Sequence, residues 1–523
     1  MGQYVNPGCD KFEMSLNSEI YIDKSNLIAK TNAFVRTERR FICISRPRRF
    51  GKTMAANMLA AYYGAGEDTH RLFGDLNIAA DDTYEKHLNK YHVIMINMQE
   101  FLSRTNTVTQ MLTLLQSKVI KDLQEIYPTI KYDKMDDFIE AMKDTYQKTK
   151  RPFIILLDEW DCLFREYKND HNAQKKYLDF LRLWLKDQAY VGLAYMTGIL
   201  PIKKYGSHSA LNMFDEYSMT SPSQFINYFG FTASEVEQLS HEYQIDLDEI
   251  EKWYNGYFTE LGNSIYNPRS VTSCLTLKEF DNYWNKTETY EALKDYIKLN
   301  FDGLRDKVTR MLSGESIGIN TRRFKNDMTT MESADDILTL LVHLGYLTYN
   351  FKNKTISIPN EEVKDEFVTA IESLNWTNVV DALRESDKLL KAIWNQDADL
   401  VAEGIGKVHE QNTSILQYNN ENALSCVISL ALYCASEYYT VVRELPTGKG
   451  YSDLVFMPRQ QHSNKPALVV ELKWNQTAEG AIHQIKHKNY PVALETYQGN
   501  LLLVGINYDK KDKTHTCVIE SIN

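Results

Sequence analysis

Two groups of polar residues, far apart in the chain, have the types and spacing that phosphate chemistry requires. The first is SRPRRFGKT at 45–53, where Gly51, Lys52 and Thr53 have the order found at the end of a phosphate-binding loop. Such a loop points backbone N–H groups and a helix N-terminus at phosphate oxygens. The lysine neutralises phosphate charge, and the Ser/Thr hydroxyl binds magnesium. Taken alone, a GKT triplet is as well explained by chance.

A second element, FIILLDEWD at 153–161, favours a nucleotide site over chance. It places Asp158 and Glu159 at the end of a buried strand, where Asp158 would hold magnesium and Glu159 would polarise the attacking water as general base. The alternative is that two carboxylates merely end a strand at its wet edge. Thr197, at the end of the apolar run VGLAYMT, could sense the γ-phosphate, although threonine is also common in strands.

The second polar group lies near the C-terminus, in 451–473. Asp453 is early in one expected strand, and Glu471 and Lys473 are two residues apart on the next, so these two share a face. A hairpin would bring Asp453 beside Glu471, and the paired carboxylates would favour a divalent cation, Mg²⁺ or Mn²⁺. Lys473 could orient or deprotonate a metal-bound water and stabilise a pentavalent phosphate. This is the D…ExK arrangement of restriction-endonuclease-like phosphodiesterases.

The D…ExK pattern is weak by itself, because most matches are ordinary strands with a solvated face. Two neighbours strengthen it: Glu421 on the preceding expected helix as a further metal-binding carboxylate, and Gln484 on the following one. With these residues present, an intact active site is favoured over a decayed one.

The elements that must carry these groups follow from hydrophobic patterning. Short apolar strands at 41–45, 93–98, 153–158 and 191–197 alternate with helical stretches, including 53–63, which predicts a parallel sheet covered on both faces. A capping box at 232–235 opens a helical region. An apolar helix from 334 to Gly345, followed by a hairpin that turns at 353–354, suggests a winged-helix-like module or a small packing domain.

The C-terminal region is predicted to have the order helix, three strands, helix, strand. The expected bounds are 420–437, 439–444, 452–457, 467–473, 478–495 and 501–507. We therefore expect an α/β multidomain protein: a P-loop domain at 1–215, a helical domain at 216–315, a winged-helix-like module at 316–395 and a restriction-endonuclease-like domain at 396–523.

Composition excludes some classes of protein. The 523 residues are 43% hydrophobic and 25% charged, with a net charge of −11, which argues against a surface that is basic overall. Residues 441–523 carry ten Lys/Arg against eight Asp/Glu, a mildly basic balance that permits nucleic-acid binding. Seven scattered cysteines without CxxC indicate reduced thiols. No apolar run approaches the ~20 residues that span a bilayer, so we expect a cytoplasmic protein without a membrane partner.

Several motifs, in order along nearly the whole chain, resemble the bacterial AAA-ATPase-like proteins that pair a P-loop domain with a C-terminal PD-(D/E)XK nuclease-like domain. They are YIDKSNLI (21–28), SRPRRFGKT (45–53), LLDEWD (156–161), MTGILPI (196–202), YFGFTASEV (228–236), WYNGY (253–257), YNPRSV (266–271) and the D…ExK block. In that family the loop typically lacks its first glycine. The resemblance implies Mg-ATP binding by Lys52, Thr53 and Asp158, and a segment around Asp23 and Lys24 that borders the nucleotide.

The loop RPRRFGKT raises a physical question of its own. Pro47 removes one backbone donor from the phosphate cradle, whereas Arg46, Arg48 and Arg49 add cations beside Phe50 and Gly51. We expect at least one arginine to compensate by contacting the polyphosphate. The alternative is that the arginines pair with acidic neighbours.

The leading hypothesis is an ATP-regulated, metal-dependent nuclease acting on nucleic acid, with DNA preferred, and with homo-oligomerisation left open. The runner-up is a STAND-type signalling or scaffold ATPase whose C-terminal domain binds nucleic acid or a partner without cutting. A purely structural protein would require both groups of residues to be coincidences.

Overall fold

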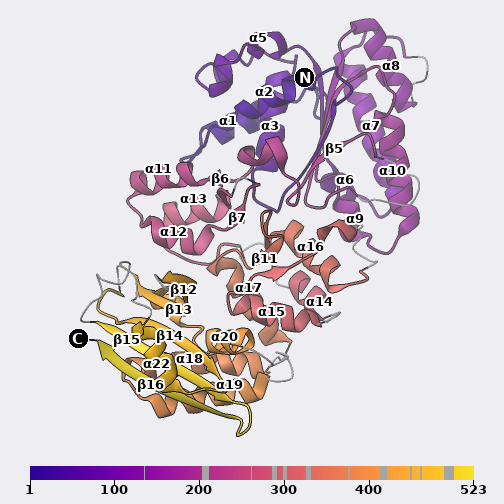
Figure 1. The fold of residues 1–523 in the computed structure, drawn as a ribbon. Coiled ribbons are helices and arrows are strands. Elements are labelled where there is room, and N and C mark those ends of the chain that lie inside the picture. The colour runs from indigo at the N-terminus through magenta and orange to yellow at the C-terminus, as the bar shows by residue number, and fades with distance from the viewer. Residues whose placement is uncertain are drawn as a thin grey trace. The chain divides into compact units, whose positions relative to one another are not determined.

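The computed structural model describes residues 1–132, 134, 136–202, 211–260, 262–284, 291–298, 303–324, 331–374, 377–412, 421–447, 450–459, 462–487 and 500–522 (Figure 1). The chain forms two compact units. The first unit comprises residues 1–288 and 318–363, and the second comprises 289–317 and 364–523. The four-part division expected from the sequence remains a prediction.

A five-stranded parallel sheet forms the centre of the first unit, in the order β2-β3-β4-β1-β5. Its strands are β1 Phe41–Ser45, β2 His92–Asn97, β3 Phe153–Asp158, β4 Val191–Gly198 and β5 Asp215–Tyr217. Strands β1, β3 and β4 are buried at every residue, as continuous apolar runs in a parallel sheet require. The expected strands are all present. The short β5 is an additional edge strand, and its acidic sequence does not predict a strand.

Helices cover both faces of this sheet (Figure 1). One side carries α1 to α3, and the other carries α7, α8 and α10. The N-terminal elements are α1 Asp10–Leu16, α2 Asn26–Asn32, α3 Lys52–Tyr63, α4 His70–Phe73, η1 Asn77–Ala80 and α5 Tyr84–His87. The others are α6 Met98–Ser103, α7 Val108–Ile126, α8 Phe138–Thr149, α9 Cys162–Glu166 and α10 His171–Leu185. This confirms the α/β P-loop-like architecture.

A smaller group of helices with its own apolar core completes the first unit. Its elements are η2 Ser223–Tyr228, β6 Phe231–Thr232, α11 Ala233–Tyr243, α12 Leu247–Tyr254, β7 Tyr257–Phe258, β8 Ser264–Tyr266 and α13 Pro268–Leu277. The predicted capping box is present, with Thr232 and Glu235 exchanging hydrogen bonds at the start of α11. The predicted helix is α16 Ala334–Leu344, and the predicted hairpin is formed by β10 Thr348–Asn350 and β11 Thr355–Ser357; the short η4 Thr321–Arg323 precedes them.

The second unit is built on a five-stranded mixed sheet in the order β12-β13-β14-β15-β16. Its strands are β12 Tyr439–Thr447, β13 Gly450–Pro458, β14 Ala467–Trp474, β15 Leu501–Asp509 and β16 Thr514–Ile522. Only β14 and β15 are parallel to each other. Helix α22 packs on the face that Val469 and Leu503 share, and α20 also contacts β14.

The helices of this unit are α14 Glu291–Lys298, α15 Leu304–Leu312, α18 Thr377–Trp394, α19 Ala398–Asn412, α20 Glu421–Ala431, α21 Ala435–Tyr438 and α22 Ala478–His487. Strand β9 Ile317–Gly318 and helix α17 Glu361–Ser373 lie where the chain passes between units. The predicted order is present, and β16 is an additional strand. Its mixed burial explains why THTCVIESI lacks a clear strand pattern. No helix in the described part of the chain is both long and apolar enough to cross a bilayer.

Candidate functional sites

The loop between β1 and α3 has the geometry of an anion-binding turn. Gly51 has φ of +84° and caps α3, a left-handed conformation that glycine adopts without strain. The next two residues, Lys52 and Thr53, open the helix, so the N–H groups of its first turn lack helical acceptors. These donors and the positive end of the helix dipole favour a phosphate at this position.

The Lys52 ammonium is buried within this loop. It donates to the carbonyl oxygens of Arg46 at 3.0 Å and Pro47 at 2.8 Å. Burial lowers the pKa of Lys52, and the nearby carboxylates of Glu159 and Asp158 oppose that shift. A buried ammonium held only by carbonyl oxygens is well placed to gain an anionic partner.

Asp158 lies at the centre of a hydroxyl network. Thr53 donates from Oγ1 to Asp158 Oδ2 at 2.7 Å, and Thr197 donates to Asp158 Oδ1. Strands β3 and β4 are neighbours, which brings Asp158 and Thr197 to the same carboxyl edge of the sheet. In this structure Thr197 therefore orients Asp158, and its predicted role toward the γ-phosphate stays a prediction.

Glu159 follows β3 with φ of +53° and lines the cavity described below. Its carboxylate accepts a hydrogen bond from Arg165, whose Nε also lies 3.5 Å from Asp161 Oδ2. Asp161 is buried and accepts from the backbone N–H groups of Ile199 and Leu200 at 3.1 and 2.8 Å. Burial raises the pKa of Asp161, against the opposing effect of Arg165. Arg165 therefore fixes the position of the candidate base.

The arginines of the loop face different ways. Arg46 is buried, donates to the carbonyl oxygens of Ser45 and Tyr217 at 2.9 Å, and lies 5.7 Å above the Phe229 ring. Burial lowers its pKa to about 10. Arg48 and Arg49 line the cavity instead, and Arg49 Nη1 donates to the Tyr283 carbonyl at 2.9 Å. Of the three arginines, Arg48 and Arg49 thus line the cavity, and the phosphate contact expected of one of them stays a prediction.

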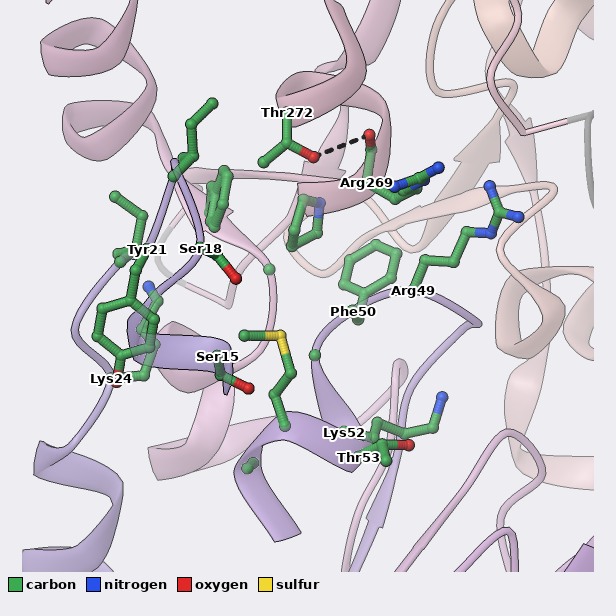
Figure 2. Close-up of a pocket in the computed structure, with 18 of the residues that line it drawn as sticks. Ser15, Ser18, Tyr21, Lys24, Arg49, Phe50, Lys52, Thr53, Arg269 and Thr272 are labelled. Carbon is green, nitrogen blue, oxygen red and sulfur yellow. Dashed lines mark hydrogen bonds between the residues drawn. The ribbon is translucent and has the colours of Figure 1, made fainter. Parts of the chain in front are cut away.

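A cavity of about 850 Å³ opens in front of the loop (Figure 2). One part of its wall carries the cations and hydroxyl of Lys52, Thr53, Arg48 and Arg49. The remaining wall is mainly apolar, formed by Phe12, Ile20, Ile22, Phe50, Met58, Phe231 and Leu277 among others. Both the volume and this division of polarity are typical of a site for a ligand with a charged and an apolar end.

Arg269 was not singled out as a site residue from the sequence, although it lies in the motif YNPRSV. It is at the start of α13, lines the cavity and is exposed. Figure 2 shows its guanidinium on the same side of the cavity as that of Arg49. Among the described residues its guanidinium has no hydrogen-bond or ion-pair partner. The signal in the sequence was an arginine directly after a Pro at a helix start.

The segment containing Asp23 and Lys24 is divided between two roles. Lys24 lines the cavity, but its ammonium is bound to both carboxylate oxygens of Glu235 at 2.7 Å and to the Asn227 carbonyl. Asp23 accepts from the backbone N–H groups of Ser25 and Asn77, both at 2.7 Å. Lys24 thus borders the cavity, whereas Asp23 shapes the backbone of that segment.

The second candidate site lies on β14 in the C-terminal unit. Glu471 and Lys473 are both buried, and Lys473 Nζ lies 3.5 Å from Glu471 Oε1. Gln484 of α22 donates to the same Glu471 oxygen, so α22 covers the face that carries both residues. The antiparallel register pairs Leu454 with Val470. Asp453 and Glu471 are the next residues along these two strands, and the expected contact of their carboxylates stays a prediction.

Glu421 opens α20, but its side chain and that of Asp453 lie outside what the structure describes. Two further residues of β15 belong to this site by register: Gly505 opposite Glu471, and the buried Asn507 opposite Lys473. A Cβ at Gly505 would come within 2.4 Å of the Ala478 carbonyl oxygen, so glycine permits α22 to approach the sheet here. Sequence reasoning missed both, because their relevance depends on strand register.

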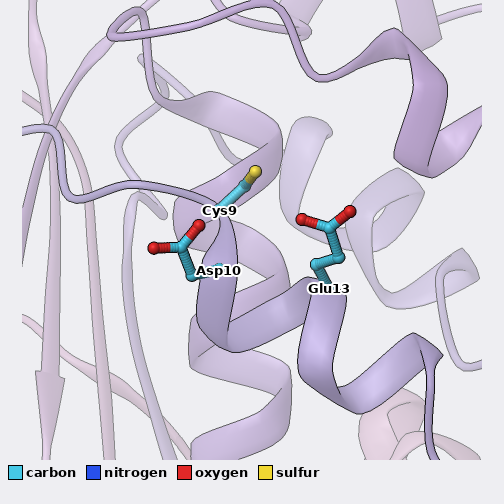
Figure 3. Close-up of side chains that lie close together, drawn as sticks. All are labelled: Cys9, Asp10 and Glu13. Atoms are coloured by element: carbon cyan, nitrogen blue, oxygen red, sulfur yellow. The ribbon is translucent and has the colours of Figure 1, made fainter.

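A third group, Cys9, Asp10 and Glu13, lies near the N-terminus (Figure 3). Arg71 binds both carboxylate oxygens of Glu13, at 2.5 and 3.0 Å. Burial and the neighbouring Glu67 raise the pKa of the Cys9 thiol to about 11, so it is protonated at neutral pH. The Arg71 guanidinium already binds the Glu13 carboxylate, and the Cys9 thiol is protonated. Both facts argue against a metal ion at this group.

The parallel sheet with its phosphate loop defines the first unit as a P-loop ATPase-like domain, and the mixed sheet with Glu471 and Lys473 defines the second as nuclease-like. Residues 8–207 match the family described as "Predicted AAA-ATPase", and residues 419–517 match the PD-(D/E)XK nuclease superfamily. The chain is thus an AAA-ATPase-like domain with a C-terminal domain of the PD-(D/E)XK nuclease superfamily.

Individual relatives are distant. An uncharacterised protein encoded in the vnfD 5′ region of Azotobacter chroococcum mcd 1 is 26% identical over 266 residues, which are 49% of this chain and 48% of that protein. The match thus spans about half the length of that relative.

Two solved structures from Aeropyrum pernix also align. ORC1 in complex with DNA is 12% identical over 88% of this chain and 96% of its own, with a TM-score of 0.26. ORC2 in ADPNP-ADP complexes is 8% identical over 70% and 92%, with a TM-score of 0.27. Scores this low carry no conclusion about this chain.

Proposed function

We propose that the first unit binds and hydrolyses ATP in the 850 Å³ cavity. The observation that carries this proposal is the buried Lys52 ammonium beside the Thr53–Asp158–Thr197 network, at the end of a cavity that is otherwise mainly apolar. The chemistry fits Mg-ATP: a hydroxyl and a carboxylate suit Mg²⁺, a cation suits the phosphates, and the apolar wall suits a base. Bound Mg²⁺ would neutralise charge that develops on the phosphates.

Each residue of this site has a role in the proposal. Lys52 binds the β- and γ-phosphates, and Thr53 and Asp158 hold the metal ion. Glu159 accepts a proton from the attacking water, and Arg165 fixes its orientation. Arg48, Arg49 and Arg269 bind the polyphosphate from the open side, which offsets the backbone donor that Pro47 lacks.

We further propose that the second unit is a metal-dependent nuclease that cleaves phosphodiester bonds, with DNA as the preferred substrate. Carboxylate oxygens of Glu471, Asp453 and Glu421 provide the hard ligands that Mg²⁺ or Mn²⁺ prefers, and either ion would supply Lewis-acid activation. Lys473, held 3.5 Å from Glu471, orients the nucleophilic water and stabilises the charged phosphate. Gln484 fixes the Glu471 carboxylate through its hydrogen bond.

Both proposed activities can be tested in one experiment with two readouts. The first is ATP turnover, and the second is Mg²⁺- or Mn²⁺-dependent cleavage of duplex DNA, single-stranded DNA and RNA. We expect Lys52→Ala to lower ATP turnover at least a hundredfold, because it removes the buried cation of the phosphate site. Lys473→Ala should lower cleavage by a similar factor and leave ATP turnover unchanged. Lys86→Ala, on the exposed face of α5, and Lys486→Ala, paired with Glu520, are matched controls.

If Lys473→Ala cuts nucleic acid as fast as wild type, the nuclease assignment is wrong. If wild type turns over ATP but cleaves none of the three substrates, the chain is better described as a signalling or scaffold ATPase.

A further inference from the structure

The turn between β15 and β16 carries three exposed lysines, Lys510, Lys511 and Lys513; we name residues 510–513 the lysine turn. We propose that the lysine turn binds the phosphate backbone of the nucleic acid that the Glu471 and Lys473 site would cleave. This inference rests on the proposed nuclease function and adds to it a substrate-binding surface.

The position of the turn follows from strand register. Strands β14 and β15 are parallel and adjacent, with Lys473 opposite Asn507 and Trp474 opposite Tyr508. The turn begins three residues beyond Asn507, so at a rise of about 3.3 Å per residue it lies roughly 10–20 Å from Lys473 along the strand direction. With about 3.4 Å between successive phosphates along a duplex axis, that is on the order of three to six nucleotides from the cleaved bond.

The turn is tied to the strand that carries the candidate catalytic residues. Asn475, the residue after β14, donates its N–H to the Tyr508 carbonyl at 2.8 Å and accepts from the Lys510 N–H at 2.8 Å. Its φ of +54° is a left-handed conformation that asparagine tolerates better than most residues. Asp509 accepts from the N–H groups of Lys511 and Asp512 at 2.8 and 3.2 Å. The lysines are therefore presented from an ordered backbone.

The three ammonium groups are available to an external anion. In the described part of the chain none of them has a carboxylate partner, although Asp512 is exposed within the same turn. Three other lysines of the unit, Lys388, Lys391 and Lys407, are instead paired with acidic residues at 2.8, 2.5 and 2.6 Å. Unpaired lysines beside a phosphodiesterase-like site indicate a polyanion that enters that site, and this favours nucleic acid over an acidic peptide or a membrane.

The test is the salt dependence of binding by the full chain, measured in EDTA so that no cleavage occurs. Labelled duplex and single-stranded DNA of one sequence are titrated over a series of KCl concentrations. We expect the triple variant K510S/K511S/K513S to reduce the slope of log K against log[KCl] by about 2.7 on duplex or about 2.1 on single strands, since each lost phosphate contact removes about 0.9 or 0.7. With Mg²⁺ restored, the variant should raise KM and leave kcat unchanged.

The matched control is K388S/K391S/K407S, which removes three lysines that already have carboxylate partners. It should keep the wild-type slope, and ATP turnover of both variants should equal that of wild type. If wild type binds DNA and the lysine-turn variant keeps the same slope, the inference is wrong and the nuclease proposal stands. The inference is also wrong if the variant loses binding only to polyglutamate or to anionic vesicles. If wild type neither binds nor cuts any nucleic acid, the nuclease proposal and this inference fail together.

Discussion

The arginines of the phosphate loop show how far a residue type can be interpreted from sequence. Three cations beside GKT could be predicted to compensate for Pro47, but not which of them face the phosphates. Arg46 is turned inward by contacts with the Tyr217 carbonyl and the Phe229 ring, which are distant in sequence. Only the fold determines that Arg48, Arg49 and Arg269 remain on the cavity wall. The carboxylates Asp158 and Glu471 were easier to predict, because each ends or nearly ends an apolar strand.

Glu362 is a buried carboxylate that no sequence motif marks as functional. Its Oε1 accepts from the N–H groups of Tyr283 and Trp284 at 2.9 Å, and its Oε2 accepts from Ser270 Oγ at 2.9 Å. Ser270 follows Arg269, and Arg49 bonds the Tyr283 carbonyl. Glu362 therefore connects the start of α17 to α13, which lines the cavity, and to the Tyr283 backbone that Arg49 contacts. Burial raises its pKa from 4.5 to about 7, against the opposing effect of these hydrogen bonds and of Arg49.

This raised pKa predicts a pH-dependent stability. The folded state holds the Glu362 proton up to about pH 7, whereas the unfolded chain releases it near pH 4.5. The contribution to stability is therefore complete below pH 4.5 and lost as pH rises through 7. Glu362→Gln mimics the protonated form at every pH. Between pH 5 and pH 8, the unfolding free energy of wild type should therefore fall by up to about 3 kcal/mol relative to that of Glu362→Gln.

Urea unfolding at both pH values measures this difference. Glu361→Gln, the same change one residue earlier, is the matched control. An equal difference for Glu362→Gln at pH 5 and pH 8 would contradict the assigned titration.

At the scale of elements, the C-terminal end of α16 supports the phosphate loop. Gly345 ends this helix with φ of +90°, and a Cβ there would lie 2.7 Å from the Trp284 ring and 2.8 Å from Pro47 Cβ. The Tyr257 hydroxyl also donates to the Gly345 carbonyl at 2.7 Å. The helix and hairpin thus include a packing contact with the loop that carries Lys52, while the winged-helix-like module and the small packing domain both remain predictions.

This contact predicts a specific effect of Gly345→Ala. The left-handed φ should cost about 1–2 kcal/mol of stability, and the new methyl group should also displace Pro47, raising the KM for ATP several-fold. Gly262→Ala is the matched control, because Gly262 has φ of +85° with no atom within 4 Å of its Cβ position. It should lose stability and keep the wild-type KM. Steady-state ATPase assays on both variants distinguish a local contact from general strain. Equal KM values for Gly345→Ala and Gly262→Ala would contradict the proposed effect of the Gly345–Pro47 contact.

The helices and strands that could be predicted from the sequence are those with a clear local pattern of apolar or capping residues. Strands β1, β3 and β4 are continuous apolar runs, α11 begins at a capping box, and α16 is an apolar helix that ends at Gly345, so their positions were evident. Strand β5 has the short sequence DEY, and β16 contains only exposed and half-buried residues, so neither has an apolar pattern. Gly505 and Asn507 join the nuclease-like site only through the β14–β15 register, which no local pattern determines.

At the scale of the whole molecule, one chain carries an AAA-ATPase-like domain and a PD-(D/E)XK nuclease superfamily domain. Our central claim is that nucleotide in the first controls cleavage by the second. Helix α17 is a covalent connection between the two units. It begins at Glu361, next to the hydrogen-bonded Glu362, and its later residues belong to the second unit. A movement of Arg49 or Arg269 on ATP binding would alter the contacts that Glu362 makes at the start of that helix.

The most direct test is the rate of Mg²⁺-dependent DNA cleavage by the full chain with ATP, with ADP and without nucleotide, for wild type and for Lys52→Ala. We predict that wild type cleaves several-fold faster with ATP than in the other two conditions, and that Lys52→Ala shows one slow rate in all three. A wild-type rate that is the same with ATP, with ADP and without nucleotide would contradict the claim.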